Sequence, residues 1–293
     1  MTTLSNANAS RRDTTALDEE SSRFSYARWL LESALLIVLA IVCIALEDLA
    51  LAPKSVDHQQ FASGLLTFAI EIGLMVPFAL SVNPWLGLPG APLIAATIEG
   101  ERVRFRIRSL FKISVGYAFL ALMVGGAVLA IVFLPLILAH PKMQLPVRSF
   151  MKLPPGRLAI IGTLVSIAAG VGEEIQFRLV SFAVFAWIAS LFTSGSSGPS
   201  SRGALWFATI MQAYAFGLFH RGPANDLLRL LGWSHSAIPL LVSGLLVPQT
   251  SIGIVLGRLY LRRGLEASML AHAMIDATLF VMLALIRSLL KTG

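Results

Sequence analysis

The 293-residue chain has a single cysteine and few charged side chains. Its one thiol, Cys43, lies inside an apolar run, which excludes a disulfide framework. Charged residues make up 13% of the sequence, against about 25% in ordinary soluble domains. Residues 1–23 also lack an apolar h-region, so we do not expect a cleaved signal peptide there. These absences disfavour a disulfide-stapled secreted domain and an ordinary soluble one.

Long apolar runs are abundant instead. Hydrophobic residues form 56% of the chain, and the mean hydropathy is +0.77. Several runs exceed the roughly 18 residues that mark a membrane-spanning helix. The sequence therefore predicts an all-α, polytopic integral membrane protein with about seven (six to eight) transmembrane helices around a polar intramembrane cavity. In such a protein the net charge of +7 indicates topology and lipid headgroup contact rather than nucleic-acid binding.

Composition divides the chain into three predicted parts. Residues 1–23 form a disordered tail, residues 24–157 an N-terminal transmembrane part, and residues 158–290 a second membrane core. Residues 83–98 contain three prolines, which favours an interfacial or re-entrant segment. Residues 101–108 alternate arginine with apolar residues and predict a basic interfacial entry to the next helix, with a solvated loop as an equal alternative. The predicted spans are 29–51, 61–80, 113–138, 158–192, 204–220, 237–261 and 265–289.

The run 158–192 is the most informative of these. Only Glu173, Glu174 and Arg178 carry charge in it, and each costs roughly 2.5–3.5 kcal/mol on insertion scales. Residues four apart share a helix face, so Glu174 can pair with Arg178. Glu173 is offset by about 100° and has no partner within its own helix. As one straight helix the run would be about 52 Å long, against a hydrocarbon core of about 30 Å, so it must tilt, bend or divide.

Two further apolar segments carry histidine. Phe216 precedes His220 by four residues, and His272 precedes Asp276 by four, so each pair shares a helix face. A lone intramembrane histidine is more often a helix–helix hydrogen bonder than a catalyst, and a lone Glu–Arg pair can be structural. Together, however, three apolar segments supply Glu, His, His and Asp to one polar cavity. These groups suit water activation, which needs a general base, groups that polarise a carbonyl, and an orienting group.

The ordered motifs Glu-Glu-x-x-x-Arg, Phe-x-x-x-His and His-x-x-x-Asp resemble those of a known family. They are similar to the CAAX prenyl protease and bacteriocin-processing (CPBP, or Abi) family of intramembrane endopeptidases. The run from Gly253 to Gly264, with Gly257, Arg258 and Tyr260, also resembles the family's approach to its last motif. The resemblance covers roughly residues 158–290, a little under half of the chain.

The resemblance implies a role for each motif residue. Glu173 would be the general base for the attacking water. His220 and His272 would line the site, hold water or metal, and stabilise the oxyanion, and Asp276 would lie where the family often has Asn. An ionised Asp cannot donate to an oxyanion, so Asp276 would be protonated, orient His272 or bind metal. The residues in supporting roles, which brace the helix or pack in the site, would be Glu174, Arg178 and Phe216.

These residues predict an intramembrane endopeptidase that hydrolyses a membrane-associated protein or peptide. We expect it in the bacterial cytoplasmic membrane, with the lipid bilayer and its substrate as partners and no nucleic acid. The preferred mechanism needs no cofactor. The alternative is a zinc site formed by Glu173, His220 and His272 with water as fourth ligand.

Two non-proteolytic functions stay open from the sequence. One is a non-enzymatic membrane partner of the same fold, for example in self-immunity against a secreted peptide. The other is proton- or ion-coupled transport through intramembrane groups that include Glu32 and Glu71. We see no internal repeat of the kind that many transporters carry.

Overall fold

The computed structural model of the chain describes residues 26–51, 58–133, 153–193, 200–220 and 248–291. Over these ranges the chain forms helices and short connections, with no strand. The predicted tail therefore lies outside the described residues. The elements are α2 (Tyr26–Leu51), α3 (His58–Leu86), α4 (Pro92–Ile98), α5 (Arg104–Val128), the π-helix η1 (Leu129–Phe133), α7 (Pro155–Glu174), the π-helix η3 (Ile175–Ser181), α8 (Phe182–Thr193), α9 (Arg202–Phe219), α12 (Pro248–Arg263) and α13 (Leu265–Lys291).

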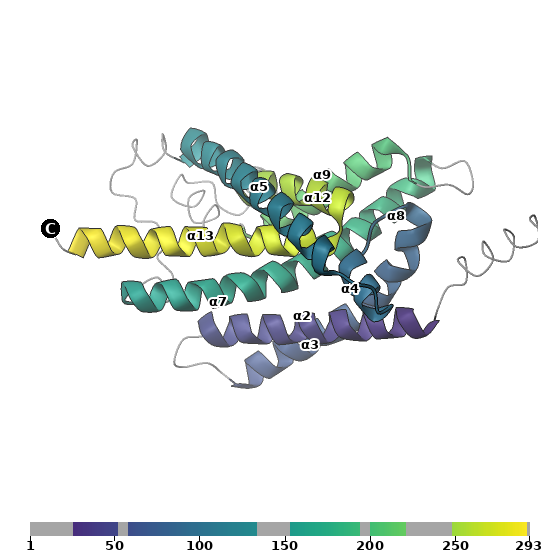
Figure 1. Cartoon of the computed structure of the whole chain (residues 1–293), viewed down its shortest axis with the longest axis horizontal. Coiled ribbons are helices and arrows are strands. Elements are labelled where there is room, and N and C mark those ends of the chain that lie inside the picture. The colour runs from purple at the N-terminus through teal and green to yellow at the C-terminus, as the bar shows by residue number, and fades with distance from the viewer. Residues whose placement is uncertain (1–25, 52–57, 134–152, 194–199, 221–247, 292–293) are drawn as a thin grey trace, which may run out of the picture.

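Helix α7 occupies the middle of the bundle. It packs along α13 on one side and along α2 on the other, and Figure 1 shows these helices lying roughly parallel. Helix α5 crosses α12 and α13, and α9 packs between α12 and α8. The three predicted motifs lie on α7 and η3, on α9 and on α13, so this packing brings their segments together.

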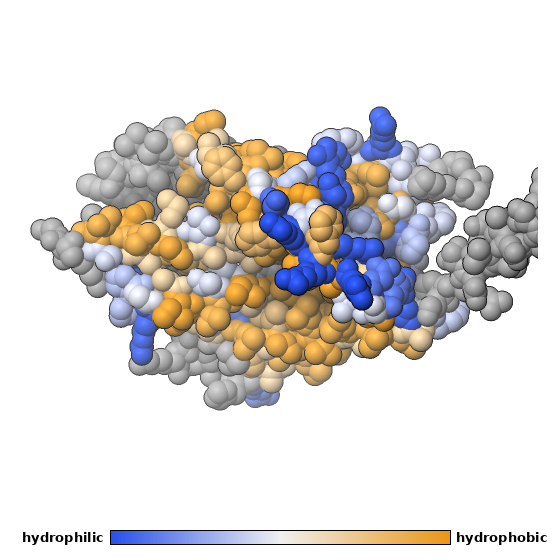
Figure 2. Space-filling view, viewed as in Figure 1, coloured by the Kyte–Doolittle hydropathy of each residue, from blue (hydrophilic) through white to orange (hydrophobic). Residues whose placement is uncertain are grey.

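Five helices in the described part of the chain are long and apolar enough to cross a membrane. They carry many exposed large hydrophobic side chains, and Figure 2 shows apolar surface over much of one face. The all-α, polytopic membrane fold is thus confirmed. Two further predicted spans are not among the five. Helix α9 covers most of the predicted span 204–220, and the first part of the predicted span 237–261 lies outside the described residues.

The proline-containing segment 83–98 is broken, as predicted, but its first residues belong to the preceding helix. Helix α3 continues to Leu86 with Pro84 inside its last turn. Proline has no N–H to bond the carbonyl four residues earlier, so it disfavours continuation of the helix, which ends two residues after Pro84. The short helix α4 then begins at Pro92, at the first helical position, where its fixed φ angle suits a helix start.

Helix α4 is fastened to the start of α13. The carboxylate oxygen Oε1 of Glu266 accepts hydrogen bonds from the backbone N–H groups of Leu93 (2.8 Å) and Ile94 (2.7 Å). The N–H of Leu265 donates to the carbonyl of Gly90 at 2.9 Å. These bonds fix the position at which α13 begins, seven residues before His272.

The basic segment is part of a helix rather than only an approach to one. Helix α5 begins at Arg104, so the predicted start of this span, at residue 113, was too late. Arginine is a good helix former, and its long stem can lie along apolar surface while the guanidinium reaches water. The helix is tied to α13 further along, where the Ser114 hydroxyl donates to the Ala267 carbonyl at 2.9 Å.

The long run 158–192 divides at its polar centre. Helix α7 ends at Glu174, seven residues form the π-helix η3, and α8 follows. Short π-helical turns inside longer helices are rare and occur often at functional sites. The division therefore coincides with the charged residues that the run contains.

Candidate active site

The structure brings the three predicted segments to one point. Glu173 lies in the last turn of α7, His220 follows the last residue of α9, and His272 lies on α13. The Oε2 atom of Glu173 is 3.6 Å from Nε2 of His220 and 3.9 Å from Nε2 of His272. Glu173 and His272 are buried, whereas the His220 side chain is about a quarter exposed. Two imidazole nitrogens from different helices thus face one carboxylate oxygen.

Two glycines allow the helices around Glu173 to approach closely. A Cβ on Gly170 would lie 2.8 Å from the backbone nitrogen of Ala273, next to His272. A Cβ on Gly172 would lie 2.9 Å from the Ile44 side chain of α2. Real Cβ atoms do not approach backbone that closely, so glycine at 170 is required for α13 to lie where it does.

Glu174 has a different set of neighbours. Its Oε1 is 3.1 Å from Nη1 of Arg178, and both side chains are fully buried. The same oxygen lies 2.8 Å from Nδ1 of His272. Because an ionised carboxylate only accepts, Nδ1 of His272 carries the hydrogen and donates it. Glu174 therefore fixes the orientation of His272 from across the bundle, in addition to pairing with Arg178.

His220 is oriented by its own helix. Its Nδ1 is 2.9 Å from the backbone carbonyl of Phe216, an acceptor, so Nδ1–H donates to it. In the neutral imidazole the Nε2 lone pair then faces Glu173. The Phe216 ring is buried and packs edge-on against both histidines, with centroid distances of 4.6 Å to His220 and 5.5 Å to His272. The Arg178 guanidinium lies 4.4 Å from the centroid of the same ring.

Asp276 lies at the more exposed edge of the site. Its Oδ2 is 3.5 Å from Nε2 of His272, and about a third of its side chain is exposed. Glu47 of α2, which sequence reasoning did not place in the site, is close enough to Glu173 to act on it electrostatically.

The Oε2 atom of Glu173 is buried, and no described residue forms a hydrogen bond with it. The distances of 3.6 and 3.9 Å to the histidines exceed a direct N–H···O bond, whose usual length is about 2.9 Å. Polar groups separated by this much commonly share a bridging oxygen atom. A water or substrate oxygen held among the three groups would satisfy all of them.

The same groups are of the kind that binds zinc. Carboxylate and imidazole are suitable ligands, and both histidines present Nε2 while Nδ1 is held elsewhere, as in carboxylate-supported zinc sites. Tetrahedral ligands at 2.0–2.1 Å would be about 3.3 Å apart, closer than the 3.6 and 3.9 Å found here. No group of three such side chains in the described part of the chain has metal-site spacing. The donors are thus of the right kind but do not fit zinc as arranged, and we derive no step through a metal.

Residues 155–278 match the family model described as "Type II CAAX prenyl endopeptidase Rce1-like". No curated protein and no solved structure matches the chain. The matched segment begins at the first residue of α7 and ends two residues after Asp276, so it contains every residue that the motifs singled out.

Proposed function

We propose that this membrane protein hydrolyses peptide bonds with a water activated by Glu173, since residues 155–278 match the model of Rce1-like type II CAAX prenyl endopeptidases. One observation carries the proposal. The Nε2 atoms of His220 and His272 both face Oε2 of Glu173, an oxygen with which no described residue forms a hydrogen bond. We place the protein in the bacterial cytoplasmic membrane and its substrate class among prenylated CAAX proteins, or other membrane-associated peptides.

In the first step Glu173 removes a proton from water. A carboxylate buried away from bulk solvent is a stronger base than one in water, because burial penalises its charged form. His220 Nε2, with its lone pair directed at the same place, accepts the second hydrogen of the water. The water oxygen is thereby oriented, and it attacks the carbonyl carbon of the scissile bond.

In the same step the carbonyl oxygen becomes an oxyanion. His272 in its imidazolium form would stabilise it, with Nδ1–H donating to Glu174 and Nε2–H donating to the oxyanion. Glu174 itself is neutralised by Arg178, so the buried charges balance. Glu174 acts on the reaction through His272 and is a positioning residue.

In the second step the C–N bond breaks. The proton that Glu173 took from water passes to the leaving amine nitrogen, and the new carboxyl group keeps the water oxygen. Glu173 returns to its carboxylate form, so no external acid or oxidant is needed. Asp276, near Nε2 of His272, would favour the imidazolium before substrate binds and lies beside the oxyanion afterwards.

Transport is less well supported. The exposed Glu71 side chain lies on α3, and the charged neighbours of Glu32 are Arg28, Glu99 and Glu266 rather than Glu173 or the histidines. Neither Glu32 nor Glu71 is therefore placed to pass protons to the site within the described part of the chain. The close contacts among the motif residues favour chemistry over conduction.

The test uses the purified full chain in detergent and a farnesylated peptide that ends in a CAAX sequence. Mass spectrometry would measure release of the C-terminal tripeptide, with the same peptide lacking the prenyl group as the comparison. We expect cleavage by the wild type, with a preference for the prenylated peptide. A folded wild type that cleaves neither peptide would contradict the CAAX substrate class, and proton transport through Glu173 in proteoliposomes would contradict the proposed hydrolysis.

A further inference from the structure

One hollow in the molecule is lined by none of the motif residues. It lies where α4, the start of α5 and the end of α12 meet, and its volume is about 270 Å³. Its walls are mostly apolar and include Leu93, Phe105 and Ile113. Arg106 and Arg263 also line it. A mostly apolar hollow lined by two arginines has the chemistry to bind a molecule with an anionic head and an apolar body.

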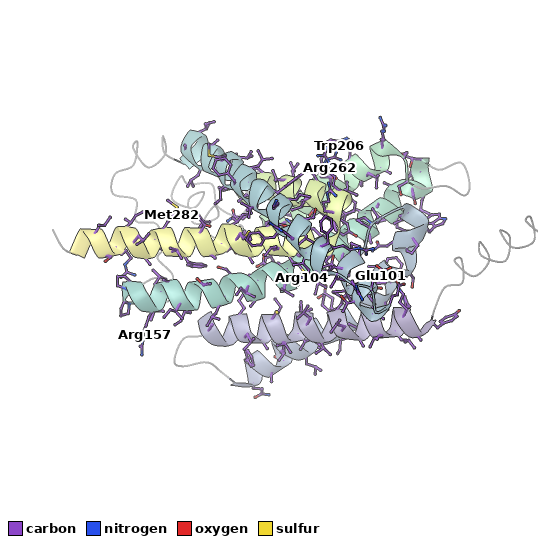
Figure 3. All side chains as sticks on the ribbon, viewed as in Figure 1. Glu101, Arg104, Arg157, Trp206, Arg262 and Met282 are labelled. Atoms are coloured by element: carbon purple, nitrogen blue, oxygen red, sulfur yellow. The ribbon has the colours of Figure 1, made fainter. Side chains whose placement is uncertain are left out.

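The hollow lies where two candidate spans begin. The span formed by α5 starts at Arg104, and the span formed by α13 starts at Leu265, two residues after Arg263. Figure 2 shows hydrophilic residues gathered over this region, with apolar surface continuing beside them, and Figure 3 labels Arg104 and Arg262 there. This is the border between headgroups and acyl chains, where a lipid has both its parts within reach.

The charge around the hollow is strongly positive. Residues 101–108 together with 262–263 contain six arginines and one glutamate. The glutamate, Glu101, is 2.8 Å from Nη2 of Arg106, but both side chains are about half exposed, so the pair is weak. A guanidinium has five N–H donors, so Arg106 keeps several for another anion. No acidic side chain lines the hollow itself.

We propose that an anionic phospholipid binds in this hollow, with its phosphate between Arg106 and Arg263 and its acyl chains along the apolar wall. Arginine suits phosphate because its planar fork can make two parallel hydrogen bonds to one phosphate group. The apolar wall favours a lipid over a soluble phosphate. Phe105, which lines the hollow, is 83% exposed, and without an acyl chain beside it the ring would face only water or headgroups.

The bound lipid joins elements that position the site without touching it. The lipid bridges α5 to the turn between α12 and α13, which is the turn that Glu266 and α4 also hold in place. We therefore expect the lipid to stabilise the fold around the start of α13. Binding should raise the Tm of the protein and should not require an intact Glu173.

The test measures binding of short-chain phosphatidylglycerol to the full chain in neutral detergent, by native mass spectrometry and by the shift in Tm. Phosphatidylcholine and inorganic phosphate are the comparison ligands. We expect a saturable site for phosphatidylglycerol only. Equal binding of phosphatidylcholine, or an equal Tm shift with inorganic phosphate, would overturn the proposal.

Substitutions of the lining arginines test whether the lipid binds in the hollow. Arg106→Gln and Arg263→Gln should each weaken phosphatidylglycerol binding about fivefold, as expected for one arginine near an anionic headgroup. Arg157→Gln is the matched control, because Arg157 is exposed at the start of α7, far from the labelled arginines of α5 and α12 in Figure 3. An equal loss in Arg157→Gln would indicate general charge attraction and contradict a defined site.

A filling substitution tests the apolar part while every arginine is kept. Ser109 lines the hollow from α5, and Ser109→Trp would occupy it. We expect phosphatidylglycerol binding to fall at least tenfold with the Tm of the lipid-free protein little changed. Wild-type binding by a folded Ser109→Trp variant would show that the lipid does not enter the hollow, whatever the arginine variants do.

Discussion

Replacing Glu174 by Gln removes one charge from a fully buried pair. The carboxylate is 3.1 Å from the Arg178 guanidinium and 2.8 Å from Nδ1 of His272, and Glu174 and Arg178 are fully buried. Gln keeps an oxygen that can accept from His272 but cannot neutralise Arg178. The Arg178 guanidinium also packs on the Phe216 ring, and after Glu174 the acid that acts on it is Glu173, more weakly. The variant therefore takes from a buried cation its nearest and strongest counter-charge.

Breaking a buried ion pair by removing one partner costs about 3–5 kcal/mol. At roughly 2–4 °C per kcal/mol for a chain of this size, the Tm should fall by roughly 6–20 °C. Differential scanning fluorimetry in detergent measures the shift. Glu71→Gln is the matched control, since Glu71 is exposed on α3 and its replacement should change the Tm little.

The double variant Glu174→Gln/Arg178→Met separates the pair from the two residues taken singly. Removing both charges takes away the unpaired cation, and Met fills part of the guanidinium volume. The double variant should therefore be more stable than Glu174→Gln alone. If Glu174→Gln melts within 2 °C of the wild type, or if the double variant is the less stable of the two, the buried pair does not contribute as reasoned.

Three further changes test the site from other directions. Cysteines that replace Glu173 and His220, in a Cys43→Ala background, should crosslink with short bifunctional reagents. A folded protein that does not crosslink would contradict the convergence of α7 and α9. Gly170→Ala should cost about 1–3 kcal/mol by overpacking against α13 and should lower turnover as well, whereas unchanged stability would refute the close approach. Asp276→Asn should keep or raise turnover, and chelators should not change the turnover of the wild type. An inactive Asp276→Asn variant, together with near-stoichiometric zinc in the purified protein, would instead support a metal mechanism.

Much of the site geometry within one helix could be predicted from spacing. The pair Glu174–Arg178 follows from four-residue spacing, and the structure has it at 3.1 Å. That Glu173 points away from this pair also follows from the helical offset of about 100°. Such predictions succeed because helix geometry alone determines which neighbours share a face.

Residue spacing within a helix could not predict the contacts between helices. The bond between Glu174 and His272 joins residues 98 apart, and no local period encodes it. Glu47 gave no signal either, because a carboxylate near a helix end needs no partner to be tolerated. The division of 158–192 was expected from its length, but its place at Ile175–Ser181 depends on how α7 packs between α2 and α13.

The central claim is that Glu173 performs peptide-bond hydrolysis, and it can be tested without knowing the substrate. New C-termini in the membrane proteome would be compared by mass spectrometry among cells that produce the wild type, Glu173→Gln or Glu71→Gln at equal levels. The account predicts a set of cleavage products that is present with the wild type and Glu71→Gln and lost with Glu173→Gln, together with accumulation of the uncleaved proteins. The same products in cells with a folded Glu173→Gln variant would contradict it.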